Sequence, residues 1–286
     1  MPLSEVDDRR LVGGKAHVLG RLRRDGFAVP PGFVITENAP VLTGAGQEAE
    51  QDGSECHPLT HAELTAACRR WIGHGRAVAV RSSAVAEDGP QRSFAGQFTS
   101  FLDVCGIEAI IDAVARCRAS GRDGRAERYR THLEAESGAE ADEPSFRQMP
   151  VLVQEMVRAD WAGVLFSVDP VRPDPAVLVV ELVPQSAALV CDGSVDPLRY
   201  RVDRLSLSVL DGPAADGGIT PDSPLVAEVA RVGLALEQAL GGPQDVEWAA
   251  QDGERPRVSI LQSRAITTLP STAGQKFGVA DVLRRL

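Results

Sequence analysis

The spacing of apolar residues divides the chain into helix-like and strand-like segments. Helical spacing occurs in residues 15–24, 60–72, 107–121, 124–135 and 224–241. Gly26 and Gly241 follow two of these segments as C-terminal stops. Thr60 and Glu63 form the residue pair of a capping box, which marks the start of a helix at residue 60.

Strand-like runs dominate the second half of the chain. Apolar or alternating runs occur in residues 33–36, 77–81, 98–106, 150–157, 162–170, 176–184, 199–204, 205–210, 245–250 and 257–267. Helices and strands together predict an α/β (α+β) protein. The polar stretch 135–145 predicts a connection between two lobes. We therefore expect an N-terminal lobe over 1–148, a C-terminal lobe over 149–270 and a tail over 271–286.

Composition and charge exclude several classes of protein. The 286 residues are 43% hydrophobic and 24% charged, as in ordinary globular proteins. The net charge of −10 argues against a nucleic-acid partner, although a few clustered cations suffice to hold a nucleotide. The five cysteines form no CxxC pair, which disfavours zinc and predicts reduced thiols in the cytoplasm. No signal-peptide pattern or long apolar run is present, so no membrane partner is expected.

A hairpin near the C-terminus carries the first candidate site. Two strand-like runs flank the turn signal Asp252-Gly253, and pairing Glu247 with Gln262 places Asp245 opposite Arg264. Strict alternation predicts one shared face for Asp245, Glu247, Val258, Ile260, Gln262 and Arg264. A carboxylate and an amide oxygen suit Mg²⁺, and a guanidinium beside them can bind a phosphate. A surface ion pair without chemistry is the alternative.

Two cationic motifs lie in the first half. Gly13 and Gly14 precede Lys15, so the backbone can approach a ligand closely while the lysine reaches a phosphate. The pattern GxxxxGK[ST] is absent, so this is not a Walker A motif. Arg81 ends an apolar run and precedes two serines, which favours an anion at the end of a strand. An ion pair with a nearby acid is the alternative.

Five ordered stretches are distributed over almost the whole length of the chain. They are GGKAHVLGRLRRDGFAVPPGFVIT, VAVRSSAVAEDGPQRSFAGQFTSFLDV, RAERYR, VLVQEMVRADWAGVLFSVDP and DVEWA…SILQSRAIT. In this order they resemble the N-terminal nucleotide-binding domain of the pyruvate phosphate dikinase, phosphoenolpyruvate synthase and rifampin phosphotransferase family. The resemblance implies an ATP-grasp fold, in which two lobes clamp ATP.

The resemblance also implies a role for individual residues. It assigns the ATP phosphates to Lys15, Arg81 and the loop at Gly96 and Gln97, adenine to the backbone around Gln154, Glu155 and Val157, Mg²⁺ to Glu247 and Gln262, and the transferring phosphate to Arg264. Lys15, Arg81 and Arg264 would be the catalytic residues. Phosphoryl transfer requires mainly that cations spread the developing charge.

The sequence departs from the family pattern in one loop. A GLGE-type loop usually follows the second-lobe strand, but Ser186 and Ala187 stand in that region here. Glu181 is the candidate replacement for the missing acid. None of the five histidines lies in a Thr-Ser-His context, so no histidine of the chain is expected to carry phosphate.

Three functions are compatible with these residues. The first is an ATP-dependent phosphotransferase that passes phosphate to a histidine of a separate partner or to a small molecule. The second is an ATP-grasp ligase that activates a carboxylate as an acyl-phosphate. The third is a non-catalytic nucleotide-binding homologue, which the altered loop would favour.

Overall fold

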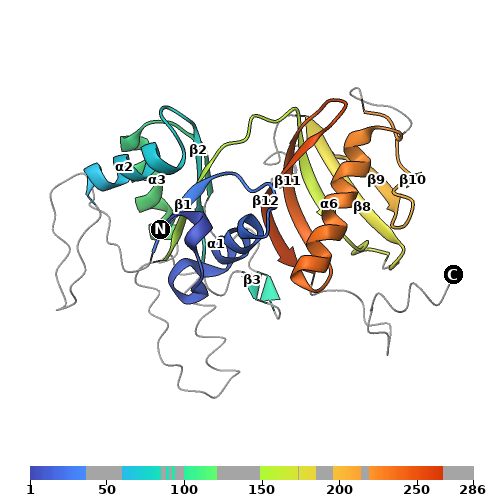
Figure 1. The fold of residues 1–286 in the computed structure, drawn as a ribbon, viewed down its shortest axis with the longest axis horizontal. Coiled ribbons are helices and arrows are strands. Elements are labelled where there is room, and N and C mark those ends of the chain that lie inside the picture. The colour runs from blue at the N-terminus through green and yellow to red at the C-terminus, as the bar shows by residue number, and fades with distance from the viewer. Residues whose placement is uncertain are drawn as a thin grey trace, which may run out of the picture. The chain divides into compact units, whose positions relative to one another are not determined.

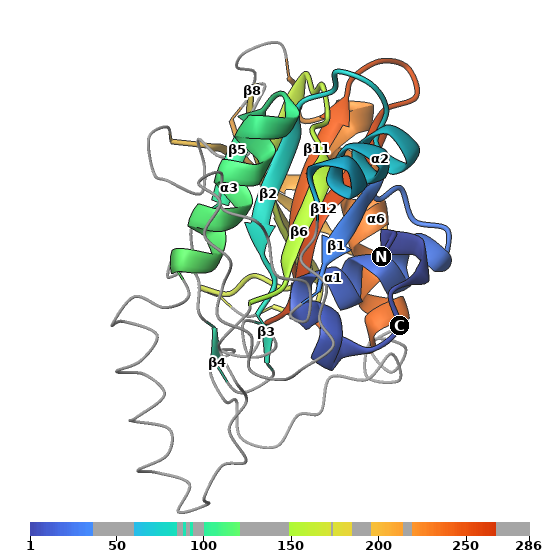
Figure 2. The same cartoon turned by 90° about the vertical axis from the view of Figure 1, so that its left-hand side faces the viewer.

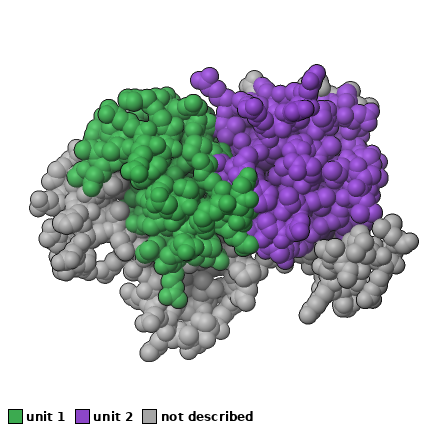
Figure 3. All heavy atoms as spheres, viewed as in Figure 1, with its two compact units in different colours: residues 1–26, 30–156 green, residues 27–29, 157–286 purple. Residues whose placement is uncertain are grey.

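The computed structural model describes residues 1–36, 60–84, 88–89, 92–93, 100–120, 149–172, 174–184, 196–213 and 219–266. The chain forms two compact units (Figure 3), Met1–Gly26 with Pro30–Met156 and Phe27–Val29 with Val157–Leu286. Both combine helices with antiparallel sheet, which confirms the mixed α/β class. In the described part of the chain, no helix has the length and apolar character needed to cross a membrane.

The first unit is built on a four-stranded sheet in the order β1-β6-β2-β5 (Figure 2). Its strands are β1 (Gly32–Ile35), β6 (Val151–Glu155), β2 (Val78–Ser82) and β5 (Ser100–Val104), and the short strands β3 (Asp88–Gly89) and β4 (Arg92–Ser93) pair separately. Its helices are η1 (Leu3–Glu5), α1 (Arg9–Arg24), α2 (His61–Trp71) and α3 (Ile107–Ser120).

The two faces of this sheet differ in chemistry. Phe33, Val153 and Val80 are paired across three strands, and they join the apolar core formed with α2 and α3. Because side chains alternate along a strand, Arg81 and Gln154 belong to the opposite face. Helix α1 contacts β1 and β6, yet its buried residues are not part of that core.

The second unit holds a six-stranded antiparallel sheet in the order β10-β9-β8-β7-β11-β12 (Figure 1). The strands are β7 (Trp161–Phe166), β8 (Val177–Pro184), β9 (Leu198–Asp203), β10 (Val209–Asp211), β11 (Gln244–Gln251) and β12 (Arg257–Ala265). Helix α6 (Pro224–Leu240) packs on the face that carries Leu165 and ends at Gly241, whose φ is 84°. Gly233 lies so close to Leu165 that an added Cβ would come within 2.2 Å of its Cδ2.

The division between units differs from the predicted lobe boundary at 148/149. Strand β6 pairs with β1 and β2, so it belongs to the first unit and the division falls after Met156. The polar stretch 135–145 suggested a boundary before β6. The sequence around β6 carries no sign that this strand pairs with β1 and β2, which lie far earlier in the chain. The predicted tail 271–286 and the predicted helix 124–135 lie outside the described residues.

One predicted helix gains a short extra turn, and one predicted strand differs in extent. A capped turn at Arg9 precedes the predicted helix over 15–24, because the Asp8 side chain accepts a hydrogen bond from the Arg10 N–H, and Gly13 with φ 78° separates this turn from the rest of α1. The predicted strand over 205–210 is a turn up to Ser208. There the Asp203 carboxylate accepts hydrogen bonds from the Leu205 and Ser206 N–H groups. Such local bonds compete with a sheet ladder.

Candidate functional site

In the first unit, the segment around Lys15 is bonded to the end of β2. Gly13 has φ 78° and ψ 173°, a conformation outside the helical region that interrupts α1. The Gly14 N–H donates to the Ala84 carbonyl at 3.1 Å. The Ser83 Oγ donates to the Val12 carbonyl at 2.7 Å and accepts from the Ala16 N–H at 3.0 Å. The GGK and RSS motifs therefore meet in one place.

This arrangement bears on both predicted phosphate residues. Lys15 lies between two residues that are bonded to Ser83 and Ala84, and its exposed fraction is 8%. Arg81 precedes this pair by two residues and is paired with Ser100 and Leu152 in the sheet. The structure thus brings the backbones that carry Lys15 and Arg81 together, while their roles in binding phosphate stay predictions.

The residues predicted to hold adenine lie where the chain leaves the first unit. Gln154 is buried, and its Nε2 donates to the Pro30 carbonyl at 3.3 Å. The Glu155 N–H donates to the Pro31 carbonyl, and its carboxylate accepts a hydrogen bond from Arg76. These side chains are therefore bonded to distant residues of the first unit, while the contacts of adenine with the backbone around Gln154, Glu155 and Val157 stay a prediction.

In the second unit, the predicted register of the hairpin is confirmed. Glu247 pairs with Gln262, and Asp245 pairs with Arg264. The Arg264 Nε donates to the Asp245 Oδ2 at 2.7 Å, and a second guanidinium nitrogen lies 2.6 Å from the same oxygen. The ion pair that was one alternative for this hairpin therefore exists, and it lies beside the carboxylate and amide of Glu247 and Gln262.

One detail of the predicted hairpin is wrong. A β-bulge shifts the register, so that Trp248 pairs with Ile260 and Leu261 has no opposite residue. The extra residue reverses the alternation of β12. Ile260 therefore lies on the apolar face, together with Trp248, whereas Gln262 lies on the polar face. The bulge lets one strand supply both core and site residues.

The polar face continues across the sheet to residues that sequence reasoning did not identify. Cross-strand pairing puts Arg199, Glu181, Val164, Glu247 and Gln262 in one row, and Arg201, Val179, Phe166, Asp245 and Arg264 in the next. Since Leu165 faces α6, both rows lie on the other side of the sheet. The alternation in Arg199-Tyr200-Arg201, with Tyr200 buried, was the available sequence signal.

Glu181 has a charged environment of its own. Its carboxylate accepts a hydrogen bond from Arg199 at 3.0 Å, and its side chain is 14% exposed. Arg199 also lies 3.5 Å from Asp169, which in turn lies 3.5 Å from Arg201. Glu181 is therefore tied to a buried network, in which Asp169 is fully buried.

Burial and neighbouring charges divide these carboxylates into two kinds. Burial raises the pKa of Glu181, and the nearby Asp245 and Asp169 add to this rise while Arg199 opposes it. Burial likewise raises the pKa of Asp245, against the effect of Arg264. For Asp169, burial alone would raise the pKa, but N–H bonds from Arg172 and Val171 and two arginines lower it. Glu181 and Asp245 therefore hold a proton more readily than free carboxyl groups, and Asp169 holds one less readily.

Glu247 and Gln262 are the residues that would hold a Mg²⁺ ion, and this role stays a prediction. Within the described ranges, no group of three or more His, Cys, Asp or Glu side chains could hold a metal ion. Glu247 and Gln262 supply one carboxylate and one amide oxygen from paired positions. Mg²⁺ normally keeps several positions for water or phosphate, so two protein ligands match its chemistry.

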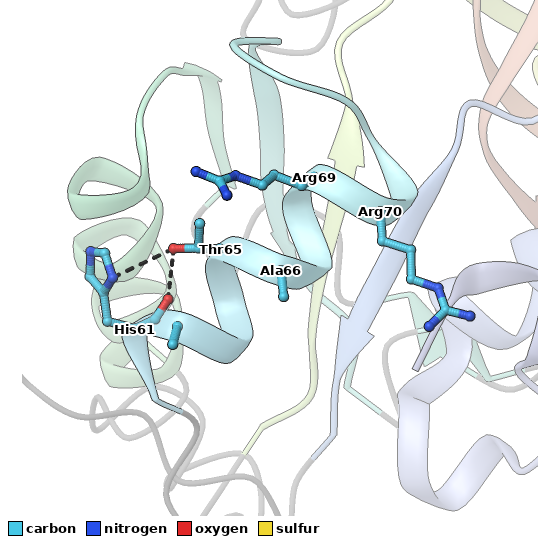
Figure 4. A pocket seen from close by; sticks show the side chains of 6 residues that line it. His61, Thr65, Ala66, Arg69 and Arg70 are labelled. Carbon is cyan, nitrogen blue, oxygen red and sulfur yellow. Dashed lines mark hydrogen bonds between the residues drawn. The ribbon is translucent and has the colours of Figure 1, made fainter.

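Two parts of the predicted site lie outside the described residues: the loop at Gly96 and Gln97, and the altered region at Ser186 and Ala187. A shallow hollow elsewhere lies on the outer face of α2 (Figure 4), lined by His61, Ala62, Thr65, Ala66, Arg69 and Arg70. The Thr65 hydroxyl donates to the His61 carbonyl within α2, and the His61 ring lies 3.2 Å from Glu108 of α3. None of its residues belongs to the motifs described above.

The fold and the site define a mixed α/β protein with two kinds of polar site. The first unit carries a lysine and an arginine on joined segments, and the second unit carries an acid–amide hairpin. The family described as "Pyruvate phosphate dikinase, AMP/ATP-binding domain" matches residues 60–223 and 220–281. The chain belongs to this family, as its resemblance indicated.

Curated relatives of the chain are longer proteins. A probable phosphoenolpyruvate synthase of Methanothermobacter thermautotrophicus is 32% identical over 317 residues, covering 92% of this chain and 45% of the relative. A rifampicin phosphotransferase of Streptomyces sp is 32% identical, covering 93% and 36%. A prodigiosin synthesizing transferase, PigC, of Serratia marcescens is 31% identical, covering 90% and 32%. The chain spans less than half the length of these relatives.

Proposed function

We propose that this chain binds Mg²⁺-ATP and acts as the ATP-dependent part of a phosphotransferase. The observation that carries the proposal is the hairpin of the second unit. There Glu247 and Gln262 are paired next to a guanidinium, on the sheet face away from α6. Membership in a family of AMP/ATP-binding domains supports ATP as the ligand.

Each residue has a physical role in this proposal. Lys15 and Arg81 bind phosphate oxygens and neutralise their charge. Glu247 and Gln262 hold Mg²⁺, which supplies further positive charge beside the phosphates. Arg264 contacts the transferring phosphate, and its bond to Asp245 orients its planar guanidinium. Such fixed charges provide most of the catalysis that phosphoryl transfer requires.

The phosphate acceptor is proposed from the names of the relatives and from the surroundings of a histidine in this chain. Relatives are named for phosphoenolpyruvate synthesis, rifampicin phosphorylation and prodigiosin synthesis, so acceptors differ within the family. In the described residues, the pKa of His17 is lowered by burial and by Arg9 and Arg24, which suits a neutral structural histidine. We therefore propose a histidine on a separate partner or a small molecule as the acceptor.

A non-catalytic nucleotide-binding protein is the second candidate. The observation that favours it is the absence of the GLGE glycines from the region around Ser186. This candidate predicts ATP binding without any nucleotide product. A ligase would give ADP and phosphate only with a carboxylate and an amine present, whereas a dikinase-type reaction gives AMP.

The test combines calorimetry with nucleotide chromatography. ATP is titrated into the protein with and without Mg²⁺, using wild type, Lys15→Met and Glu247→Gln. Glu254→Gln is the control, because Glu254 is an exposed acid in the turn of the same hairpin. We expect each site variant to weaken binding at least about tenfold, the loss of one charge-assisted contact, and the Glu247→Gln variant to lose most of the Mg²⁺ dependence.

Two outcomes would overturn the proposal. Absence of binding heat for wild type with Mg²⁺-ATP would exclude a nucleotide site. Equal affinities for Glu247→Gln and Glu254→Gln would exclude the hairpin as the metal site. Binding of ATP without AMP or ADP, across partner proteins and small-molecule acceptors, would select the non-catalytic candidate.

A further inference from the structure

We infer that Ser83 is a positioning residue, which sets Lys15 in place relative to Arg81. The inference rests on the proposed function, since it concerns how the phosphate-binding residues of the first unit are held. The sequence suggested Ser82 and Ser83 only as small polar neighbours of an anion, not as residues that hold the lysine-bearing turn. The Ser83 hydroxyl group is hydrogen-bonded to two backbone groups of α1, which lie 67 and 71 residues earlier in the chain.

The Ser83 hydroxyl lies inside an interrupted turn of α1. In a regular α-helix the Ala16 N–H would donate to the Val12 carbonyl, four residues earlier. Gly13 has a positive φ, so this turn of α1 is opened. The Ser83 Oγ accepts from the Ala16 N–H at 3.0 Å and donates to the Val12 carbonyl at 2.7 Å. One hydroxyl thus replaces a missing backbone bond.

The opened turn is the one that carries Lys15. Its two ends are fixed by Ser83, and the Gly14 N–H is fixed by the Ala84 carbonyl. Ser83 is itself anchored, because it is fully buried and its N–H donates to the Pro150 carbonyl at 3.0 Å. Only Ser82 separates it from Arg81. These hydrogen bonds therefore fix the turn that carries Lys15 relative to strand β2, which carries Arg81.

A hydroxyl is the group that this position needs. It donates one hydrogen bond and accepts another from a single atom, which a methyl group cannot do. Alanine at 83 would leave the Ala16 N–H and the Val12 carbonyl without their bonds in a buried place, so the turn would shift. A shift of the turn would move Lys15 away from Arg81 without removing either charge.

The test measures binding of Mg²⁺-ATP and of adenosine to Ser83→Ala. Adenosine lacks phosphates, so it does not use Lys15. We expect Ser83→Ala to weaken Mg²⁺-ATP at least about tenfold and to leave adenosine binding within about twofold. The control is Thr60→Ala in the same unit, whose hydroxyl also accepts one bond and donates one, both with Glu63. It should leave both affinities unchanged.

The results separate the inference from the proposed function. Lack of Mg²⁺-ATP binding by wild type would refute the proposed function itself. If wild type binds but Ser83→Ala binds Mg²⁺-ATP equally well, or loses ATP and adenosine alike, Ser83 does not position Lys15. Should Ser83→Ala not fold, Ser83→Cys takes its place. A thiol is a weak donor and acceptor, so a smaller selective loss of ATP affinity is expected, and no selective loss would refute the inference.

Discussion

Substitution of Gly13 by alanine should destabilise the first unit severely. A Cβ at this position would lie 1.3 Å from the Ser83 carbonyl oxygen and 2.7 Å from its Oγ, against ordinary contacts of 3.4 Å or more. Two backbone segments would have to separate by about 2 Å. The bonds that join them, two from Ser83 and one from Gly14, would be lost at about 1 kcal/mol each.

Backbone strain adds to this loss. Gly13 has φ 78° and ψ 173°, which side-chain-bearing residues rarely adopt, at a cost of about 1–3 kcal/mol. The sum is about 4–6 kcal/mol, comparable with the whole stability of a small domain. Urea unfolding followed by pulsed hydrogen exchange and peptide mass spectrometry measures the first unit separately from the second.

Gly26→Ala is the matched control. Gly26 follows the same helix with φ 89°, but an added Cβ would meet no atom within 4 Å. Only the positive φ is then penalised, by about 1 kcal/mol. If Gly13→Ala and Gly26→Ala cost the same within about 0.5 kcal/mol, the close contact with Ser83 does not constrain the fold, and the reasoning fails.

Two further predictions concern ionisable groups. Asp169 has a lowered pKa in the folded state, so its charge stabilises the fold above about pH 3.9 and this stability is lost as pH falls through the lowered pKa. Asp169→Asn should therefore cost about 3 kcal/mol at pH 7, because Arg199 and Arg201 lose a buried partner, and less at pH 3. Urea unfolding measures the free energy of unfolding of both proteins at the two pH values. An equal loss for Asp169→Asn at pH 7 and at pH 3 would contradict this prediction. Burial raises the pKa of Cys68 to about 11, so roughly one thiol in a thousand is ionised at pH 8. Peptide mapping after iodoacetamide treatment should show exposed Cys105 labelled before Cys68, and equally fast labelling of the two would count against protection by burial.

Local patterns predicted the parts of the site that depend on neighbouring residues. The hairpin register followed from two strand-like runs around one turn, and it brought Glu247 opposite Gln262 as expected. The capping box at Thr60 was also predicted correctly, since both of its hydrogen bonds join residues three apart. In each case the interacting groups are close in sequence.

Long-range contacts explain what the sequence did not reveal. Ser83 bonds a helix about 70 residues away, and β6 finds its partners in strands far earlier in the chain. The bulge at Leu261 was missed because counting residues assumes a regular ladder. The bulge suits the residues of β12. With strict alternation Ile260 and Arg264 would lie on the same face, so either the apolar side chain would be exposed or the charged one would be buried.

The path of Phe27–Val29 limits how the two units can be separated. These three residues belong to the second unit although they follow α1, and the Ala28 carbonyl accepts from the Ile260 N–H on the outer edge of β12. Cutting the chain once after Met156 would therefore remove the segment that accepts a hydrogen bond at this edge, one residue from the bulge that directs Gln262. A fragment beginning at Val157 would carry an open strand edge, the kind of surface through which proteins aggregate.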